Sequence, residues 1–175
     1  MKRTVVRFGL YGALVEVVFF FISLIIAGVT KANYEVLKIN CYPAIIVSLS
    51  FTYFGIRYYR DHFNNGTISF NKALALGMLI VLIPAVCFAF SDAIYDTILD
   101  PHFYDGVEQA KIKALGQSDS AQDLNAKVAT IKSQLNFYRN PIVNFAIMFI
   151  TVCFFGFLIA VFSALKLKPQ ALKSV

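Results

Sequence analysis

The sequence contains few of the residues from which catalytic and metal sites are built. Its only two histidines, His62 and His102, are isolated from one another. The three cysteines, Cys41, Cys87 and Cys153, are far apart, so they match neither a disulfide framework nor the spacing of a zinc site. The chain also lacks a paired nucleophile and base and a glycine loop for phosphate. We therefore expect no catalytic residue, no cofactor, no metal and no enzymatic activity.

Tryptophan is absent, and acidic residues are scarce. Ten Asp and Glu residues stand against sixteen Lys and Arg, which gives a net charge of +6. In a soluble protein this excess would suggest a nucleic-acid partner. Here the bases flank apolar runs and form no basic face with interleaved aromatic residues, so we expect no nucleic acid. Tyrosines take the place of tryptophan near the ends of the runs, as an interfacial belt requires.

Long hydrophobic runs are what the sequence does contain. Hydrophobic residues make up 58% of the chain, against about 45–50% in soluble domains. They gather in four runs, at about residues 8–29, 41–59, 73–95 and 142–165. Each has about the 20 residues that a helix needs to cross a bilayer, and the runs are continuous, which favours helices over barrel strands. The sequence predicts an all-α fold, an integral membrane four-helix bundle that forms a single domain over residues 1–175.

The distribution of Lys and Arg predicts how this bundle faces. Cytoplasmic flanks carry the excess of bases. Nine of them fall in about 33 residues at 1–7, 57–72 and 166–175, and seven fall in about 60 residues at 30–40 and 93–141. We expect both termini in the cytoplasm and residues 96–140 outside it. We interpret the first run as an uncleaved span, since it is longer than the hydrophobic part of a signal peptide.

The polar segment 96–140 is predicted to be a helical extracytoplasmic insert between spans 3 and 4. Asp100-Pro101 ends the third span. One helix is expected from about 105 to 115 and a second from about 120 to 138. The second has a single apolar stripe at helical spacing, formed by Leu124, Val128, Ile131 and Leu135. This stripe packs on the preceding helix or on the membrane surface in one interpretation, and binds another protein in the other.

Short connections join the other spans. Residues 30–40 are predicted to form a short loop. Asn65-Gly66 is a strong turn signal, after which Ser69 or Asn71 is placed to cap the third span. Asn140 is placed to cap the fourth span, with proline at its first helical position. Small residues at intervals of four, such as Ala44, Ser48 and Thr52, mark faces on which the helices pack.

Glu16 is the one carboxylate in the middle of the first run. It lies nine residues past Arg7, about 13 Å inside the boundary and near the midplane. A carboxylate at that depth is costly, so it should face the bundle. We expect it to be protonated and to donate a hydrogen bond between helices. The candidate partners are Thr52 and Tyr53 of the second span, with Tyr11 and the carbonyl freed by Pro84 as alternatives.

A second acidic feature lies at the outer end of the third run. Asp92 and Asp96 are one helical turn apart, a spacing that suits a cation site or acid-base chemistry. Because they fall where the span should end, we interpret them as a solvated flank.

Residues 55–77, GIRYYRDHFNNGTISFNKALALG, combine a basic and aromatic helix end, an Asn-Gly turn and an Ile-Ser-Phe entry into the next span. With the later polar insert and Asn-Pro start, the chain resembles domain-of-unknown-function family 4199. The resemblance implies a four-span protein of the bacterial inner membrane and no established activity.

Two functions are compatible with these features. The first is a non-enzymatic bundle that packs with or regulates other envelope components, with the lipid bilayer around it and a membrane-protein partner or a second copy beside it. The second is a small transporter or ion conduit that uses Glu16.

Overall fold

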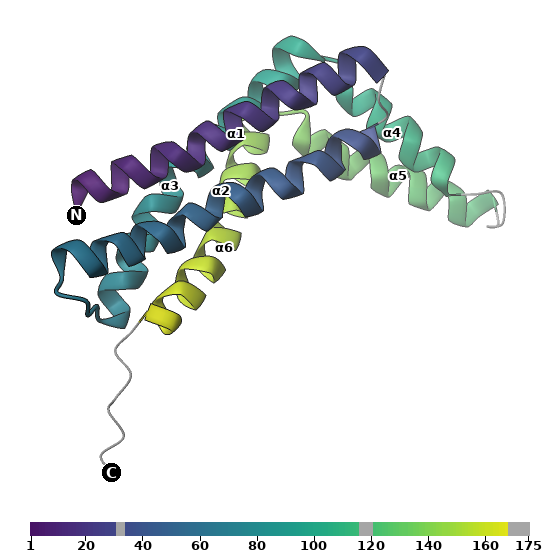
Figure 1. Ribbon diagram of the computed structural model, residues 1–175. Helices are drawn as coiled ribbons and strands as arrows, with labels where there is room; N and C mark the ends of the chain where they lie inside the picture. Colours follow the sequence, from purple (N-terminus) through teal and green to yellow (C-terminus); the bar gives the residue numbers. More distant parts are fainter. Residues whose placement is uncertain (31–33, 116–120, 168–175) are drawn as a thin grey trace.

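The structure, a computed structural model, describes residues 1–30, 34–115 and 121–167, with the side chains of 27–30, 34–41 and 121–123 left aside. In these residues the secondary structure is helical and contains no strand, so the all-α prediction is confirmed. Helix α3 continues directly into a π-helical turn, η1. The elements are α1 (Lys2–Thr30), α2 (Tyr34–Phe63), α3 (Phe70–Ile94), η1 (Tyr95–Leu99), α4 (Phe103–Ala114), α5 (Ala121–Tyr138) and α6 (Pro141–Leu167) (Figure 1).

Among the described helices, three are long and apolar enough to cross a membrane. They are α1 over Lys2–Ile26, α3 together with η1 over Phe70–Leu99, and α6. This is the composition of a membrane-type helical bundle, as predicted. Helix α2 has 30 residues but carries charges towards both ends, and its crossing of the membrane stays a prediction.

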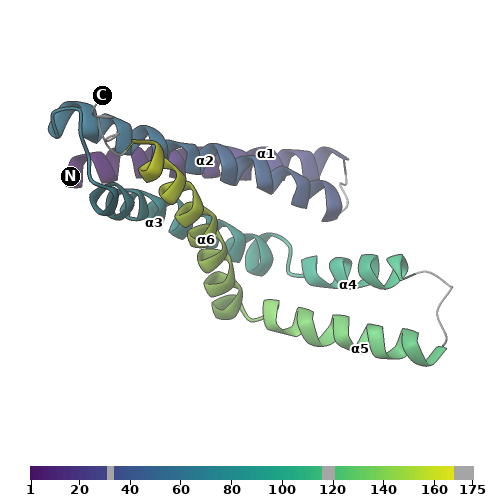
Figure 2. The same ribbon diagram turned by 90° about the horizontal axis from the view of Figure 1, so that it is seen from below.

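The four long helices pack into one bundle, from which α4 and α5 project as a hairpin. Helix α3 packs most extensively on α6, and α1 packs on both α2 and α3. The start of α1, the α2–α3 connection and the end of α6 lie at one end of the bundle, and the α4–α5 hairpin lies at the other (Figures 1 and 2). We call these the first end and the hairpin end.

Two clusters of apolar side chains fill the core. The cluster at the first end joins the end of α2, the start of α3 and the end of α6, with Val5 and Phe8 of α1 packed against it. The second cluster joins Ile45 and Leu49 of α2, Val81 and Ala85 of α3, and Val152 of α6.

The predicted packing faces of small residues are all used inside the bundle. Ala44, Ser48 and Thr52 of α2 are buried, and so are the small residues of α3 and α6. The closest approach is at Gly156 of α6, where an added Cβ would lie 2.2 Å from Cγ1 of Val81. Helices in lipid associate largely through such close contacts, because lipid tails are as apolar as the side chains.

The connections agree with the sequence in some places and differ in others. Asn65 and Gly66 have φ of 50° and 76°, which confirms the predicted turn. The side chain of Asn140 caps α6, accepting hydrogen bonds from the backbone N–H of Ile142 at 3.0 Å and of Val143 at 3.4 Å. Ser69 stands at the N-cap of α3, which confirms the predicted position, but its side chain makes no capping hydrogen bond.

The prediction of a short loop over residues 30–40 is wrong, because α2 begins at Tyr34. The segment is polar and lies between two apolar runs, a pattern that predicts a loop. However, Glu35, Leu37 and Lys38 are good helix formers, so the helix extends beyond the apolar run. Residues 31–33 lie outside the described part of the chain, as does Ser120 at the predicted start of the second insert helix.

Candidate ligand pocket between the spans and the hairpin

A pocket of about 480 Å³ lies between the spans and the α4–α5 hairpin. Its walls come from α1, α2, α3, η1, α4, α5 and α6. Most of its lining is aromatic or aliphatic. The carboxylates in the lining are those of Glu16, Asp92 and Asp96. An apolar cavity of this size with a few convergent polar groups is typical of a small-molecule site.

Glu16 reaches the pocket from α1. The residue is only 3% exposed, and its Oε1 atom has no hydrogen-bond partner among the described residues. Its neighbour on α2 is Ser48, whose buried hydroxyl lies beside the Glu16 carboxyl group. One turn earlier, α1 approaches α2 closely, since an added Cβ at Gly12 would lie 3.1 Å from Ser48 Oγ. A buried carboxyl oxygen without a donor is costly.

The partners that the sequence suggested for Glu16 lie elsewhere. Thr52 is buried, but its methyl group faces Gly77 of α3. The ring of Tyr53 lies beneath the Nζ atom of Lys166, at 5.5 Å, near the first end. Matching the depth of Glu16 in the membrane to residues of the second span therefore did not identify its neighbour, which is Ser48.

Of the two remaining candidates from the sequence, Tyr11 bonds to another residue and Pro84 lies near Gly12 of α1. Tyr11 accepts a hydrogen bond from Nε of Arg7 at 3.1 Å and is exposed. Pro84 is buried, and its Cγ atom would lie 3.4 Å from a Cβ added at Gly12. Pro84 thus lies near Gly12, where α1 and α2 come close together one turn before Glu16.

Asp92 and Asp96 form the second polar group of the pocket, together with Asn144 and Tyr104. Nδ2 of Asn144 donates to Oδ2 of Asp92 at 2.7 Å and to Oδ2 of Asp96 at 2.6 Å. The hydroxyl of Tyr104 donates to Oδ2 of Asp96 at 2.7 Å. Both aspartates are half-buried, so the interpretation of a solvated flank is wrong. The helices continue past the expected boundary as η1, and the hairpin then covers this end.

Sequence reasoning missed Asn144 and Tyr104. Asn144 is 1% exposed and its Oδ1 atom has no hydrogen-bond partner among the described residues. A signal was present, because Asn144 is a polar residue inside an apolar run, as Glu16 is. Burial and the hydrogen bond that Tyr104 donates to Asp96 raise the pKa of the Tyr104 hydroxyl above its ordinary value. Tyr104 therefore acts as a hydrogen-bond donor that ties α4 to the end of the third span.

The predicted stripe of α5 is partly buried. Leu135 is buried and lines the pocket, and Leu124, Val128 and Ile131 are half-buried. Residues 125–127, 129 and 130 are exposed. The ring of Tyr104 in α4 stacks on the ring of Tyr138 in α5, with centroids 6.2 Å apart. The stripe is thus the less exposed side of α5, and both interpretations of it stay predictions.

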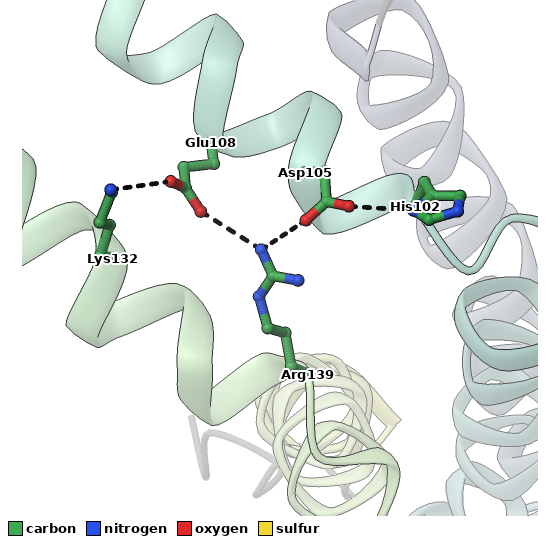
Figure 3. A network of polar contacts seen from close by, with 5 residues as sticks. All are labelled: His102, Asp105, Glu108, Lys132 and Arg139. Atoms are coloured by element: carbon green, nitrogen blue, oxygen red, sulfur yellow. Dashed lines mark hydrogen bonds and ion pairs between the residues drawn. The ribbon is translucent and has the colours of Figure 1, made fainter.

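A charged network joins α4 to α5 and to the connection between α5 and α6 (Figure 3). Nη2 of Arg139 donates to Asp105 Oδ1 at 2.7 Å and to Glu108 Oε2 at 3.2 Å. Nδ1 of His102 lies 3.0 Å from Asp105 Oδ2, and Nζ of Lys132 lies 3.7 Å from Glu108. The hydrogen bonds from His102 and Arg139 lower the pKa of Asp105, and Asp105 in turn raises the pKa of Arg139.

A metal centre is not apparent in the described residues. They contain no group of three or more His, Cys, Asp or Glu residues close enough to hold a metal ion. Cys87 and Cys153 are half-buried free thiols, each within a long helix.

Comparison with protein families identifies one match. The family described as "Protein of unknown function (DUF4199)" matches residues 7–168, which is nearly the whole chain. The chain belongs to this family. Its members carry no assigned activity in that description, so the family supplies no catalytic or binding residue. Comparisons with curated proteins and with solved structures found no match.

Proposed function

We propose that this family member is a non-enzymatic membrane protein that binds a small molecule in the pocket between its spans and the α4–α5 hairpin. This is the transporter-like function of the two that the sequence left open. The observation that carries it is Glu16, a carboxylate near the expected midplane that is 3% exposed, lines the pocket and has an oxygen with no hydrogen-bond partner among the described residues. Ionisable residues inside spans are costly, and they commonly mark substrate or ion pathways.

The packing role has less support, because the small-residue faces are already used within the chain. Gly156 meets Val81, and Gly77 meets Ala160. We propose that lipid covers the exposed apolar residues Ile98, Phe137 and Ile142 at the hairpin end. Cross-linking in membranes that captured a second copy or a membrane-protein partner at these positions would favour the packing or regulatory role instead.

We further propose that the protein lies in a bacterial inner membrane, crosses it four times, and has both termini in the cytoplasm. The density of bases supports this orientation, and the start of α1 and the end of α6 lie at the same end of the bundle. The test uses Asn65→Cys and Ser118→Cys, each in a background without native cysteines. On intact cells an impermeant thiol reagent should label residue 118 and spare residue 65. The reverse pattern would contradict the orientation.

Ligand binding can be tested with a fluorescent reporter, because the chain has no tryptophan of its own. Phe88→Trp places an indole in the pocket wall, and Phe162→Trp, at a position 69% exposed, is the matched control. The probes are 1-benzylpyridinium, whose ring quenches indole emission, and its neutral isostere diphenylmethane. We expect at least one probe to give a saturable change in the Phe88→Trp protein and neither to do so in the control. Only linear, equal changes in both proteins would contradict a binding pocket.

The role of Glu16 separates binding from structural support. Glu16→Gln should preserve the level of folded protein in membranes, since the amide has the same shape. Glu16→Leu removes the polar group altogether and should lower that level if Glu16 serves only to join helices. If Gln preserves folding and abolishes the saturable response, Glu16 acts on the ligand. If both variants fold and respond as the parent does, Glu16 has no part in binding.

A further inference from the structure

We propose that the ligand of this pocket is an organic cation, with a positively charged nitrogen and an aromatic or other apolar body. This inference rests on the proposed function, and it names the class of molecule that the pocket is built to take. Three independent features of the lining carry it, namely the sign of its charges, the nature of its walls, and the arrangement of its polar groups.

The ionisable side chains in the lining are predominantly acidic. Glu16 approaches from α1, and Asp92 and Asp96 approach from the end of the third span. Among the described lining residues the single base is Lys111, which is exposed on α4. An anionic ligand would meet three carboxyl groups and one ammonium group, so the pocket disfavours it.

The walls select an organic cation over a metal ion. They are lined by Phe19, Phe20, Phe88 and Phe103, together with several tyrosines. Aromatic faces attract an ammonium or pyridinium group, and they also bury its apolar body. A Ca²⁺ or Mg²⁺ ion needs six or more converging oxygen atoms, and the described residues contain no cluster that supplies them.

The polar groups are held in place for a positive partner. Asn144 donates to both Asp92 and Asp96, and Tyr104 donates to Asp96, which fixes two carboxylates one turn apart. A positive group that binds between them or beside them favours their charged forms. Glu16 lines the same cavity from α1 although it is only 3% exposed, and its Oε1 atom is buried without a hydrogen-bond partner among the described residues. This oxygen distinguishes the pocket from a cluster of acidic residues on a surface.

The experiment compares 1-benzylpyridinium with diphenylmethane, which has the same shape without the charge. The Phe88→Trp protein is used in detergent or in bilayer discs, and diphenylmethane is measured by its displacement of the quencher. We expect the cation to bind at least about tenfold more tightly than its isostere, the effect of one desolvated cation–π or charge-assisted contact. Glu16→Gln and Asp96→Asn should each weaken cation binding about tenfold and leave the affinity for diphenylmethane within about twofold. Unchanged binding of the neutral probe also shows that the variants are folded.

Asp61→Asn is the matched control, because Asp61 is a carboxylate near the end of α2, close to the first end and away from the pocket. It should change neither affinity. Equal affinity for the two probes, or a preference for the cation that survives both pocket variants, would overturn the inference while leaving a binding pocket in place. Absence of saturable binding by either probe would overturn both this inference and the proposed function.

Discussion

The contact between Gly156 of α6 and Val81 of α3 gives a quantitative test of the bundle. An alanine Cβ at position 156 would lie 2.2 Å from Cγ1 and 2.7 Å from Cγ2 of Val81. Carbon atoms pack at about 3.5–4.0 Å, so the overlap exceeds 1 Å. Val81 is fully buried within the second core cluster. The helices must therefore separate or the valine must adopt a strained rotamer.

We expect Gly156→Ala to destabilise the protein by about 2 kcal/mol, within the range of about 1–3 kcal/mol for an overpacked core. The intrinsic preference of a helix for alanine over glycine acts in the opposite direction by up to about 1 kcal/mol. Gly106→Ala measures that second effect alone, because an added Cβ at Gly106 of α4 meets nothing within 4 Å. Gly106→Ala should therefore be neutral or slightly stabilising.

The decisive measurement is a double-mutant cycle with Val81→Ala. Stability is read from helical circular dichroism during titration of the detergent-solubilised protein with sodium dodecyl sulfate. Val81→Ala alone leaves a cavity, but it also removes the atoms that would overlap. The double variant should recover at least about 1 kcal/mol relative to the sum of the single changes. An effect of Gly156→Ala no larger than that of Gly106→Ala, or an additive double variant, would refute the packing of α6 on α3 described above.

Three further expectations concern the α4–α5 hairpin. Arg139→Gln removes two ion pairs and should raise amide hydrogen exchange in α4 several-fold. The control is Arg57→Gln, which removes one long exposed ion pair and should leave exchange in α4 unchanged. Equal effects of the two substitutions would contradict the network. His102 and Arg139 lower the pKa of Asp105 in the folded protein. The contribution of Asp105 to stability is therefore complete above its ordinary pKa of about 3.9, and it is lost as the pH falls through its lower pKa in the folded protein. Exchange in α4, corrected for its intrinsic rate, should thus increase below about pH 4 in the parent and not in an Asp105→Asn protein. Ile131→Asp, on the half-buried stripe, should lower the level of folded protein by well over half. The control is Ala129→Asp, on the exposed face, which should leave that level unchanged. Similar losses from the two substitutions would show that the stripe is not packed.

The membrane character and the helices could be predicted from the sequence because they depend on local properties. An apolar run of about 20 residues fixes a span by its own length, and Asn140 caps α6 through atoms two and three residues away. The turn at Asn65 and Gly66 is equally local, since it depends on which residues tolerate positive φ.

The pocket could be predicted only in part, because depth along a helix says nothing about rotation around it. Counting residues placed Glu16 near the midplane, and the same count placed Thr52 beside it. The close approach at Gly12 instead sets Ser48 of α2 beside Glu16, and turns Thr52 towards α3. That contact depends on the shapes of two helices together, which no single segment of the sequence describes.

The hydrogen-bond network around Asp92 and Asp96 could not be predicted from the sequence, for a related reason. Its donor, Asn144, lies 52 residues from Asp92 in the sequence. The two aspartates at the end of an apolar run look like a solvated flank until α6 and the hairpin are placed against them. Long-range partners of this kind follow from the tertiary arrangement and leave only a faint local signal, here a polar residue within an apolar run.

The most direct test of a pocket-facing carboxylate within the membrane is its chemical modification. Dicyclohexylcarbodiimide is a small apolar reagent that couples to carboxyl groups, and the modified peptide can be quantified by mass spectrometry after treatment of native membranes. We expect Glu16 to be modified, and 1-benzylpyridinium to protect it in a saturable manner, because both molecules enter the same pocket. Failure to modify Glu16, or modification that 1-benzylpyridinium leaves unchanged, would contradict a ligand pocket at Glu16.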